Sequence, residues 1–185
     1  MQAAIKAFAR SGLKETSMDD IVHESGVSKG AIYWYFKSKD ELIKELLNVF
    51  FYTEMPETLR LLTATGTASS RINNLLEFSI EEVERMIRFR PVMHELYVLA
   101  SRNKTIRKLA KRDLDAYCSI LEAIVQQGID QEEFHRADPH KVAVAIVGLV
   151  EGTILLWSLG ITEIDLEKHL LWSVNLIIDA LKTTS

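Results

Sequence analysis

The stretch from Thr16 to Lys39 constrains this chain most, because it holds two short helical patterns separated by a glycine. Ser17 is a good N-cap, and Asp20 three residues later completes a capping-box pair. Gly26 stands where the first helix needs a left-handed residue at its end. Ser28 caps the second helix. Two helices this short, joined by so tight a turn, predict a helix-turn-helix unit.

The apolar residues of this stretch predict how the two helices pack. We expect Val27 to fill the corner between them. Ile32 and Phe36 are four residues apart and therefore share the inner face of the second helix. Ser38 is predicted to cap a third helix, with Glu41 at the capping-box position.

The outer face of the second helix has the chemistry of a DNA-reading surface. Hydroxyl and ammonium donors hold phosphates, a glycine lets the backbone approach closely, and the first turn of such a helix meets base edges in the major groove. Lys37 lies just beyond the helix, placed for a phosphate. The residues predicted to bind DNA are Ser17, Ser28, Lys29, Gly30, Tyr33, Trp34, Tyr35 and Lys39.

The run from Ser28 to Lys39 resembles the DNA-binding signature of the TetR family of bacterial transcriptional regulators, and Ala7–Gly12 matches the end of that family's first helix. The resemblance is strong over residues 3–47. It implies a dimeric repressor that a small ligand releases from DNA. Family members usually carry several more residues before this point, so either the sequence is shortened or the protein lacks that arm, and the predicted DNA contacts include none from an N-terminal arm.

The composition of the chain excludes some classes of protein but does not by itself indicate DNA binding. The 185-residue chain has a net charge of −4, and residues 1–46 contain seven basic and seven acidic residues. The DNA hypothesis therefore rests on local placement. The single cysteine, Cys118, excludes an intramolecular disulfide framework and is best read as a small apolar residue. The first residues lack the apolar segment of a signal peptide, which favours a cytoplasmic protein.

Helix-period patterns dominate, with only three prolines and eight glycines. They predict an all-α fold of about nine helices. We expect a DNA-binding domain over residues 1–46 and a helical ligand-binding and dimerisation domain over residues 47–185. The clearest loop is Thr63–Ser70, where Ser69 or Ser70 is predicted to cap the next helix.

Two apolar segments near the end predict a subunit interface. Val142–Ile161 is long enough to span a membrane, but Glu151 lies within it and Asp138-Pro139 is a soluble-type helix start. Leu166–Leu181 follows as a second apolar helix. We therefore predict a homodimeric four-helix bundle and no membrane. The predicted interface residues are Val147, Glu151, Leu155, Leu170, Val174, Ile177, Ile178 and Leu181.

Adaptable and aromatic side chains in the middle of the chain predict an apolar pocket for a small-molecule effector. The group expected to line it is Met86, Phe89, Met93, Tyr97, Tyr117 and Trp157, although each alone could be ordinary core. The polar anchors considered are His94, Glu95, Asn103 and Glu151. By resemblance, the helix after Pro91 would relay ligand binding to the helix beginning near Ser38.

Enzyme motifs are missing from the sequence: it has no phosphate-binding loop, H-E-x-x-H pair or nucleophile elbow. The lone Asp20-Ile21-Val22-His23 does not make a di-iron site, so we predict no metal, no cofactor and no enzyme. Two alternatives stay open, a helical interaction protein without specific DNA binding and an all-helical enzyme. The basic stretch Arg85–Arg112, with nine basic residues and one Glu, could be a solvated face, an anion site or a further DNA contact.

Overall fold

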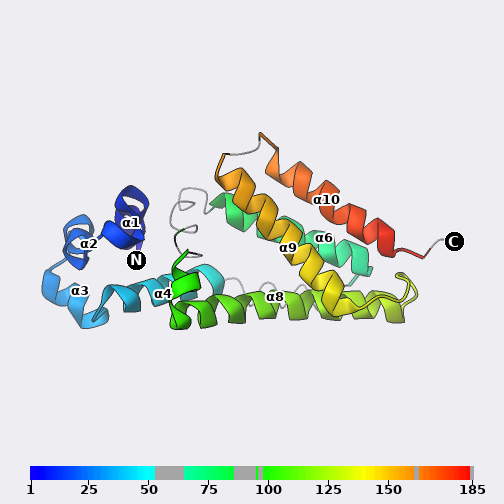
Figure 1. The fold of residues 1–185 in the computed structure, drawn as a ribbon, viewed down its shortest axis with the longest axis horizontal. Helices are drawn as coiled ribbons and strands as arrows, with labels where there is room; N and C mark the ends of the chain where they lie inside the picture. Colours follow the sequence, from blue (N-terminus) through cyan, green and yellow to red (C-terminus); the bar gives the residue numbers. More distant parts are fainter. Residues whose placement is uncertain (53–64, 86–94, 96–97, 161–162, 184–185) are drawn as a thin grey trace. The chain divides into compact units, whose positions relative to one another are not determined.

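The computed structural model describes residues 1–52, 65–85, 95, 98–160 and 163–183 (Figure 1). Within these ranges eight α-helices have defined bounds, and residues 98–102 are helical as well. The one β-type pairing found there is an isolated antiparallel bridge between Phe134 and Lys182. The predicted all-helical class is confirmed.

Contacts divide the chain into two compact units, Met1–Glu54 with Met86–Arg112, and Met55–Arg85 with Asp113–Ser185. The first unit contains α1 (Gln2–Glu15), α2 (Met18–Ser25), α3 (Lys29–Tyr35) and α4 (Lys39–Tyr52). The domain boundary predicted at residue 46 stays a prediction.

The apolar faces of the first unit meet in one core. It contains Ala4, Ile5, Ala7, Phe8, Leu13, Ile21, Leu42, Ile43, Leu46, Leu47 and Ile106. Ile106 comes from the first turns of α8 (Lys104–Asp130) and is 1% exposed. A side chain from far along the sequence therefore completes the core beneath the helix-turn-helix.

Helix α1 is broken near its end at Gly12, which has φ +82° and ψ 160°. The break removes the regular helical acceptor of the N–H groups that follow, and the Leu13 N–H donates instead to the Glu95 carboxylate. The Thr16 hydroxyl, which is buried, donates 2.7 Å to the Gly12 carbonyl and 3.2 Å to the Ala7 carbonyl. The Glu95 carboxylate thus replaces a backbone acceptor at the kink, and the Thr16 hydroxyl adds side-chain bonds to two carbonyls of α1.

The second unit contains α6 (Ala68–Arg85), most of α8, α9 (Pro139–Ser158) and α10 (Leu166–Leu181). Helix α10 packs against both α6 and α9 (Figure 1). Leu170, Val174 and Ile178 of α10 are fully buried in the core of this unit. Their four-residue spacing places them on the apolar stripe predicted from the sequence.

Capping residues were predicted for the N-termini of α9 and α6, and only the prediction for α9 is confirmed. The Asp138 carboxylate accepts the N–H groups of His140 and Lys141 at 3.1 and 3.3 Å, so α9 begins as predicted. The prediction that Ser69 or Ser70 caps α6 is wrong. Glu133, distant in sequence, accepts the Ala68 and Ser69 N–H groups at 2.6 and 2.9 Å.

Helix α9 is the one helix of the described residues that is long and apolar enough to cross a membrane. Its most apolar window has a mean hydropathy of 1.7, and 11% of that window is buried within the chain. Several of its other apolar side chains are half-buried against the core of the second unit, while Val144, Leu155 and Leu156 are exposed.

Candidate nucleic-acid interface

The predicted start and end signals fix the α2–turn–α3 geometry. The Ser17 hydroxyl accepts the Asp20 N–H at 3.1 Å, and the Asp20 carboxylate accepts the Ser17 N–H at 2.7 Å. The Ser17 hydroxyl also lowers the pKa of Asp20, since it donates to the charged carboxylate. Gly26 ends α2 in the left-handed region with φ +66°, and the Ser28 hydroxyl accepts the Ala31 N–H at 3.3 Å.

Helix α3 presents its large aromatics to solvent. Trp34 is 70% exposed and Tyr35 68% exposed, and their rings meet edge to face with centroids 4.6 Å apart. Gly30 is also exposed, with nothing within 4 Å of the place a Cβ would take. An apolar ring left this exposed on a short helix indicates a contact surface.

The inner face of α3 agrees with the prediction in part. Ile32 and Phe36 are half-buried, and Phe36 packs against the core of the first unit. The prediction that Val27 fills the corner is wrong, because this side chain is 48% exposed. Tyr33 is half-buried.

Lys29, in the first turn of α3, is held by an acidic side chain of α2. Its Nζ lies 2.7 Å from the Asp19 carboxylate and 5.7 Å from the centroid of the Tyr33 ring. The hydrogen bond to Asp19 and its charge raise the pKa of Lys29. Both members of the pair are exposed, so water screens it.

The two lysines after α3 bind carbonyl groups of their own chain. Lys37 Nζ donates to the Tyr33 and Trp34 carbonyls at 3.0 and 3.2 Å, at the end of α3. Lys39 Nζ donates to the Lys14 and Thr16 carbonyls, both at 2.9 Å, and so ties the end of α1 to the start of α4. Lysine amines at helix C-termini stabilise the unpaired carbonyls there. Sequence reasoning missed these structural contacts.

The start of α4 is capped almost as predicted. The Ser38 hydroxyl accepts the Glu41 N–H at 3.2 Å. The Glu41 carboxylate accepts the Lys37 N–H at 2.6 Å, one residue before the position that a capping box uses.

The predicted pocket residues lie partly outside the described residues, which exclude Met86, Phe89, Met93, Tyr97 and the anchor His94. Tyr117 and Trp157 are half-buried and pack against the core of the second unit. Asn103 has a structural task, because its side-chain oxygen accepts the Thr105 and Ile106 N–H groups at 2.9 and 3.2 Å. Among the described residues, no cluster of three or more His, Cys, Asp or Glu residues could hold a metal ion.

The structure separates the predicted interface residues into two groups. Leu170, Val174, Ile178 and Leu181 are buried in the core of their own subunit. Val147 and Ile177 are half-buried, and Glu151 and Leu155 are exposed. The exposed large apolar side chains of α9, its C-cap and α10 share only Leu155 with the predicted set: Val144, Leu155, Leu156, Leu159, Trp172 and Leu176.

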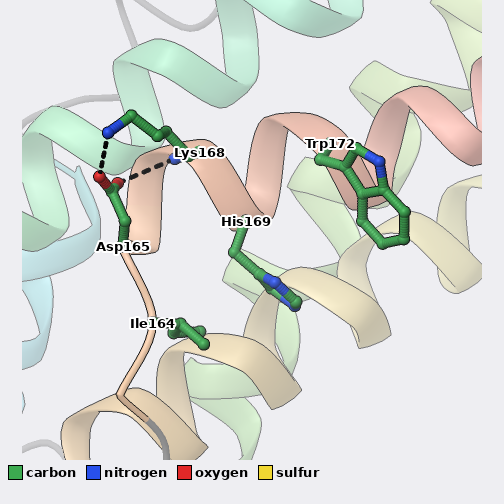
Figure 2. Close-up of a pocket in the computed structure, with 5 residues that line it drawn as sticks. All are labelled: Ile164, Asp165, Lys168, His169 and Trp172. Atoms are coloured by element: carbon green, nitrogen blue, oxygen red, sulfur yellow. Dashed lines mark hydrogen bonds and ion pairs between the residues drawn. The ribbon is translucent and has the colours of Figure 1, made fainter.

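A shallow hollow at the start of α10 lies beside this exposed set (Figure 2). Its polar members are already paired, because the Asp165 carboxylate accepts the Lys168 N–H at 3.1 Å and binds Lys168 Nζ at 2.8 Å. Its aromatic member, Trp172, is 62% exposed, with its ring centroid 6.3 Å from that of His169. An open hollow of this kind suits a protein contact better than an enclosed small-molecule site.

Comparison with known proteins agrees with this interface. The family model described as bacterial regulatory proteins, tetR family, matches residues 1–46. The uncharacterized HTH-type transcriptional regulator YfiR of Bacillus subtilis (strain 168) is 31% identical over 146 residues, which cover 75% of this chain and 68% of that protein. The probable acrEF/envCD operon repressor of Escherichia coli (strain K12) is 24% identical over 181 residues, 91% of this chain and 79% of that protein.

The fold agrees as well. The structure of FadR from Bacillus subtilis in complex with stearoyl-CoA has a TM-score of 0.84 at 20% identity and covers 97% of this chain and 96% of that one. The capped helix-turn-helix and these matches define a DNA-binding transcriptional regulator. The chain belongs to the TetR family. It is a ligand-responsive transcriptional repressor and not an enzyme.

Proposed function

We propose that this protein is a cytoplasmic homodimer that binds an inverted-repeat operator through α3 and leaves it when a small, largely apolar ligand binds. The observation that carries the proposal is the exposed face of α3. Trp34 and Tyr35 are solvent-exposed on this helix, as are Lys29 and Gly30 in its first turn. The proposed DNA contacts remain Ser17, Ser28, Lys29, Gly30, Tyr33, Trp34, Tyr35 and Lys39. Two such helices related by a twofold axis would enter successive major grooves, about 34–36 Å apart.

The uncovered surface of α9 and α10 supports dimerisation. The residues at 144, 148, 152 and 155 recur at helical spacing on α9, and Leu159 at its C-cap continues the spacing. Gly148 and Gly152 have nothing within 4 Å of the place a Cβ would take. A second copy of the same helix could approach closely along these glycines. We propose that this stripe, with Trp172 and Leu176 of α10, forms the interface, and that a second subunit rather than a lipid bilayer covers α9.

Gly148→Leu tests the interface. The new side chain meets open space in its own subunit, and leucine favours a helix more than glycine does. We expect sedimentation analysis at micromolar concentration to find monomers. Ser119→Leu, which adds the same side chain to an exposed site on α8, should remain dimeric. An unchanged dimer in Gly148→Leu would move the interface elsewhere.

For the effector we propose an apolar molecule bound among Met86, Phe89, Met93, Tyr97, Tyr117 and Trp157. The half-buried Tyr117 and Trp157 at the apolar core of the second unit support this. The FadR structure with stearoyl-CoA suggests acyl chains as first probes. A saturating acyl ligand should raise the unfolding temperature and weaken operator binding, and operator DNA must weaken ligand binding by the same factor.

For the relay we propose Glu95 as the coupling contact. It follows Pro91, in the segment expected to move with the ligand, and its carboxylate binds the Leu13 N–H at the kink of α1. The relay expected from the family resemblance ran toward the start of α4. This contact favours α1, so Glu95 replaced by alanine should reduce the effect of ligand on operator affinity.

The experiment that tests the whole proposal is selection from a random double-stranded DNA pool, followed by sequencing. Enrichment of an inverted repeat with half-sites about one helical turn apart would support it. A folded dimer that enriches no sequence would favour the alternative of a helical interaction protein.

A further inference from the structure

The three lysines around α3 are all engaged by the protein itself, but their partners differ. Lys37 and Lys39 bind backbone carbonyls, which are neutral and cannot be removed by a substitution. Lys29 is bound by a carboxylate, that of Asp19, at 2.7 Å. A carboxylate has the charge and the oxygen acceptors that a DNA phosphate offers to the same ammonium group.

The two acidic residues at the start of α2 have different tasks. Asp20 closes the capping box with Ser17, so its charge is used within its own helix. Asp19 caps nothing and reaches across to α3 instead. Its side chain is 66% exposed, beside the Lys29 side chain, which is 62% exposed. A phosphate that approaches Lys29 therefore meets Asp19 at the same place.

We propose that Asp19 is an internal competitor of DNA phosphate for Lys29 and that it sets the strength and salt dependence of DNA binding. This inference rests on the proposed role of α3 as the DNA-reading helix. In the free protein Asp19 neutralises Lys29, and on DNA that ion pair must open or be shared. Asp19 also adds a negative charge to a surface that faces phosphates.

The test is a double-mutant cycle of the full chain: wild type, Asp19→Asn, Lys29→Gln and the double variant. Asparagine keeps the shape of Asp19 and removes its charge. Affinities are measured by fluorescence anisotropy at several salt concentrations, with the operator from the selection experiment and with an unrelated duplex. Thermal unfolding of each variant checks that it is folded.

We expect Asp19→Asn to bind both duplexes more tightly, by about fivefold per subunit at low salt, the effect of one close charge pair in a water-like dielectric. The slope of log affinity against log salt should steepen by about 0.9 per subunit, because one more phosphate contact releases counterions. In the Lys29→Gln background the gain should fall below about twofold, since only general repulsion then remains.

Asp179→Asn is the matched control. Asp179 binds Lys182 at 2.7 Å with similar exposure, 65% and 50%, in the second unit. Its removal should leave DNA affinity unchanged.

Three results would overturn the proposal: unchanged affinity and slope in Asp19→Asn, weaker binding, or an equal gain with and without Lys29. Weaker binding would make Asp19 a residue that positions Lys29. Failure of the proposed function has a different signature, because the wild type would then bind the operator and the unrelated duplex equally.

Discussion

Replacing Glu95 by alanine should destabilise the first unit through a single backbone group. The kink at Gly12 leaves the Leu13 N–H without a helical acceptor, and the Glu95 carboxylate takes that place. The Leu13 side chain is 5% exposed and Glu95 is half-buried, so water reaches this site poorly. Loss of a hydrogen bond to a charged group typically costs about 1.5–3 kcal/mol.

We therefore expect Glu95→Ala to lower the free energy of unfolding by about 2 kcal/mol, and Glu95→Gln by about 1 kcal/mol, because the amide oxygen still accepts. Urea unfolding of the DNA-free protein at neutral pH measures both. Glu15→Ala, at an exposed position of the same helix, is the control and should stay within about 0.5 kcal/mol of wild type. A Glu95→Ala protein as stable as this control would refute the reasoning.

A double-mutant cycle of Gly12→Ala and Glu95→Ala tests whether the Glu95 carboxylate and the Gly12 backbone interact. Gly12 has a φ of +82°, and a Cβ there would lie 2.7 Å from Glu95 Oε1. Gly12→Ala thus carries a backbone penalty of about 1–3 kcal/mol and also displaces the carboxylate. When Glu95 is already alanine, only the backbone penalty remains. The double variant should be more stable than the sum of the single effects predicts, and simple additivity would mean that the two residues do not interact.

Three further predictions concern single side chains. Lys39→Ala should lower the free energy of unfolding by about 1–2 kcal/mol, because it frees the Lys14 and Thr16 carbonyls, and thermal unfolding without DNA measures this. Trp34→Ala should leave that stability within about 0.5 kcal/mol but weaken operator binding, since the ring is solvent-exposed; unchanged affinity would remove Trp34 from the interface. Glu133→Gln should cost about 1 kcal/mol at pH 7 through the cap of α6. Burial raises the pKa of Glu133, but the Ser69 and Ala68 hydrogen bonds outweigh it and lower the pKa overall. The stabilisation is therefore present above the unfolded pKa of about 4.3 and is lost as the pH falls through the lower folded pKa, so the stabilities of wild type and variant from urea unfolding should converge in acid below the folded pKa.

The sequence predicted features that depend on a few neighbouring residues. The capping box of Ser17 and Asp20, the left-handed Gly26 and the Asp138 start of α9 are confirmed, because caps join groups within four residues. The end helix Leu166–Leu181 also has its predicted bounds, which were inferred from the helical spacing of its apolar residues.

Contacts between distant residues were beyond the sequence. Glu133 binds the first N–H groups of α6, beside the local cap that the Thr67 hydroxyl gives to the Ser70 N–H, and Glu95 binds the Leu13 N–H at the kink of α1. No local pattern marks Glu133 or Glu95 for these contacts. Periodicity found the apolar stripe of α10, but it could not tell whether a second subunit or the same chain covers it. The structure buries Leu170 and Val174 within their own subunit and leaves Trp172 exposed. Tertiary packing decides whether an apolar side chain is covered by its own chain or is left for a second subunit.

The hydrogen bonds and the ion pair that the lysines around α3 make within the protein predict a weak salt dependence of operator affinity. Lys29, Lys37 and Lys39 each give up an internal partner if they bind phosphate, and residues 1–46 carry no net charge. Neutral donors such as the Tyr35 hydroxyl and the Trp34 indole N–H release no counterions of their own. Operator affinity should therefore fall only about tenfold to a hundredfold between about 50 and 200 mM salt, less than for six to ten ionic contacts. A steeper loss in that titration would mean that all three lysines of each subunit exchange their internal partners fully for phosphates on DNA.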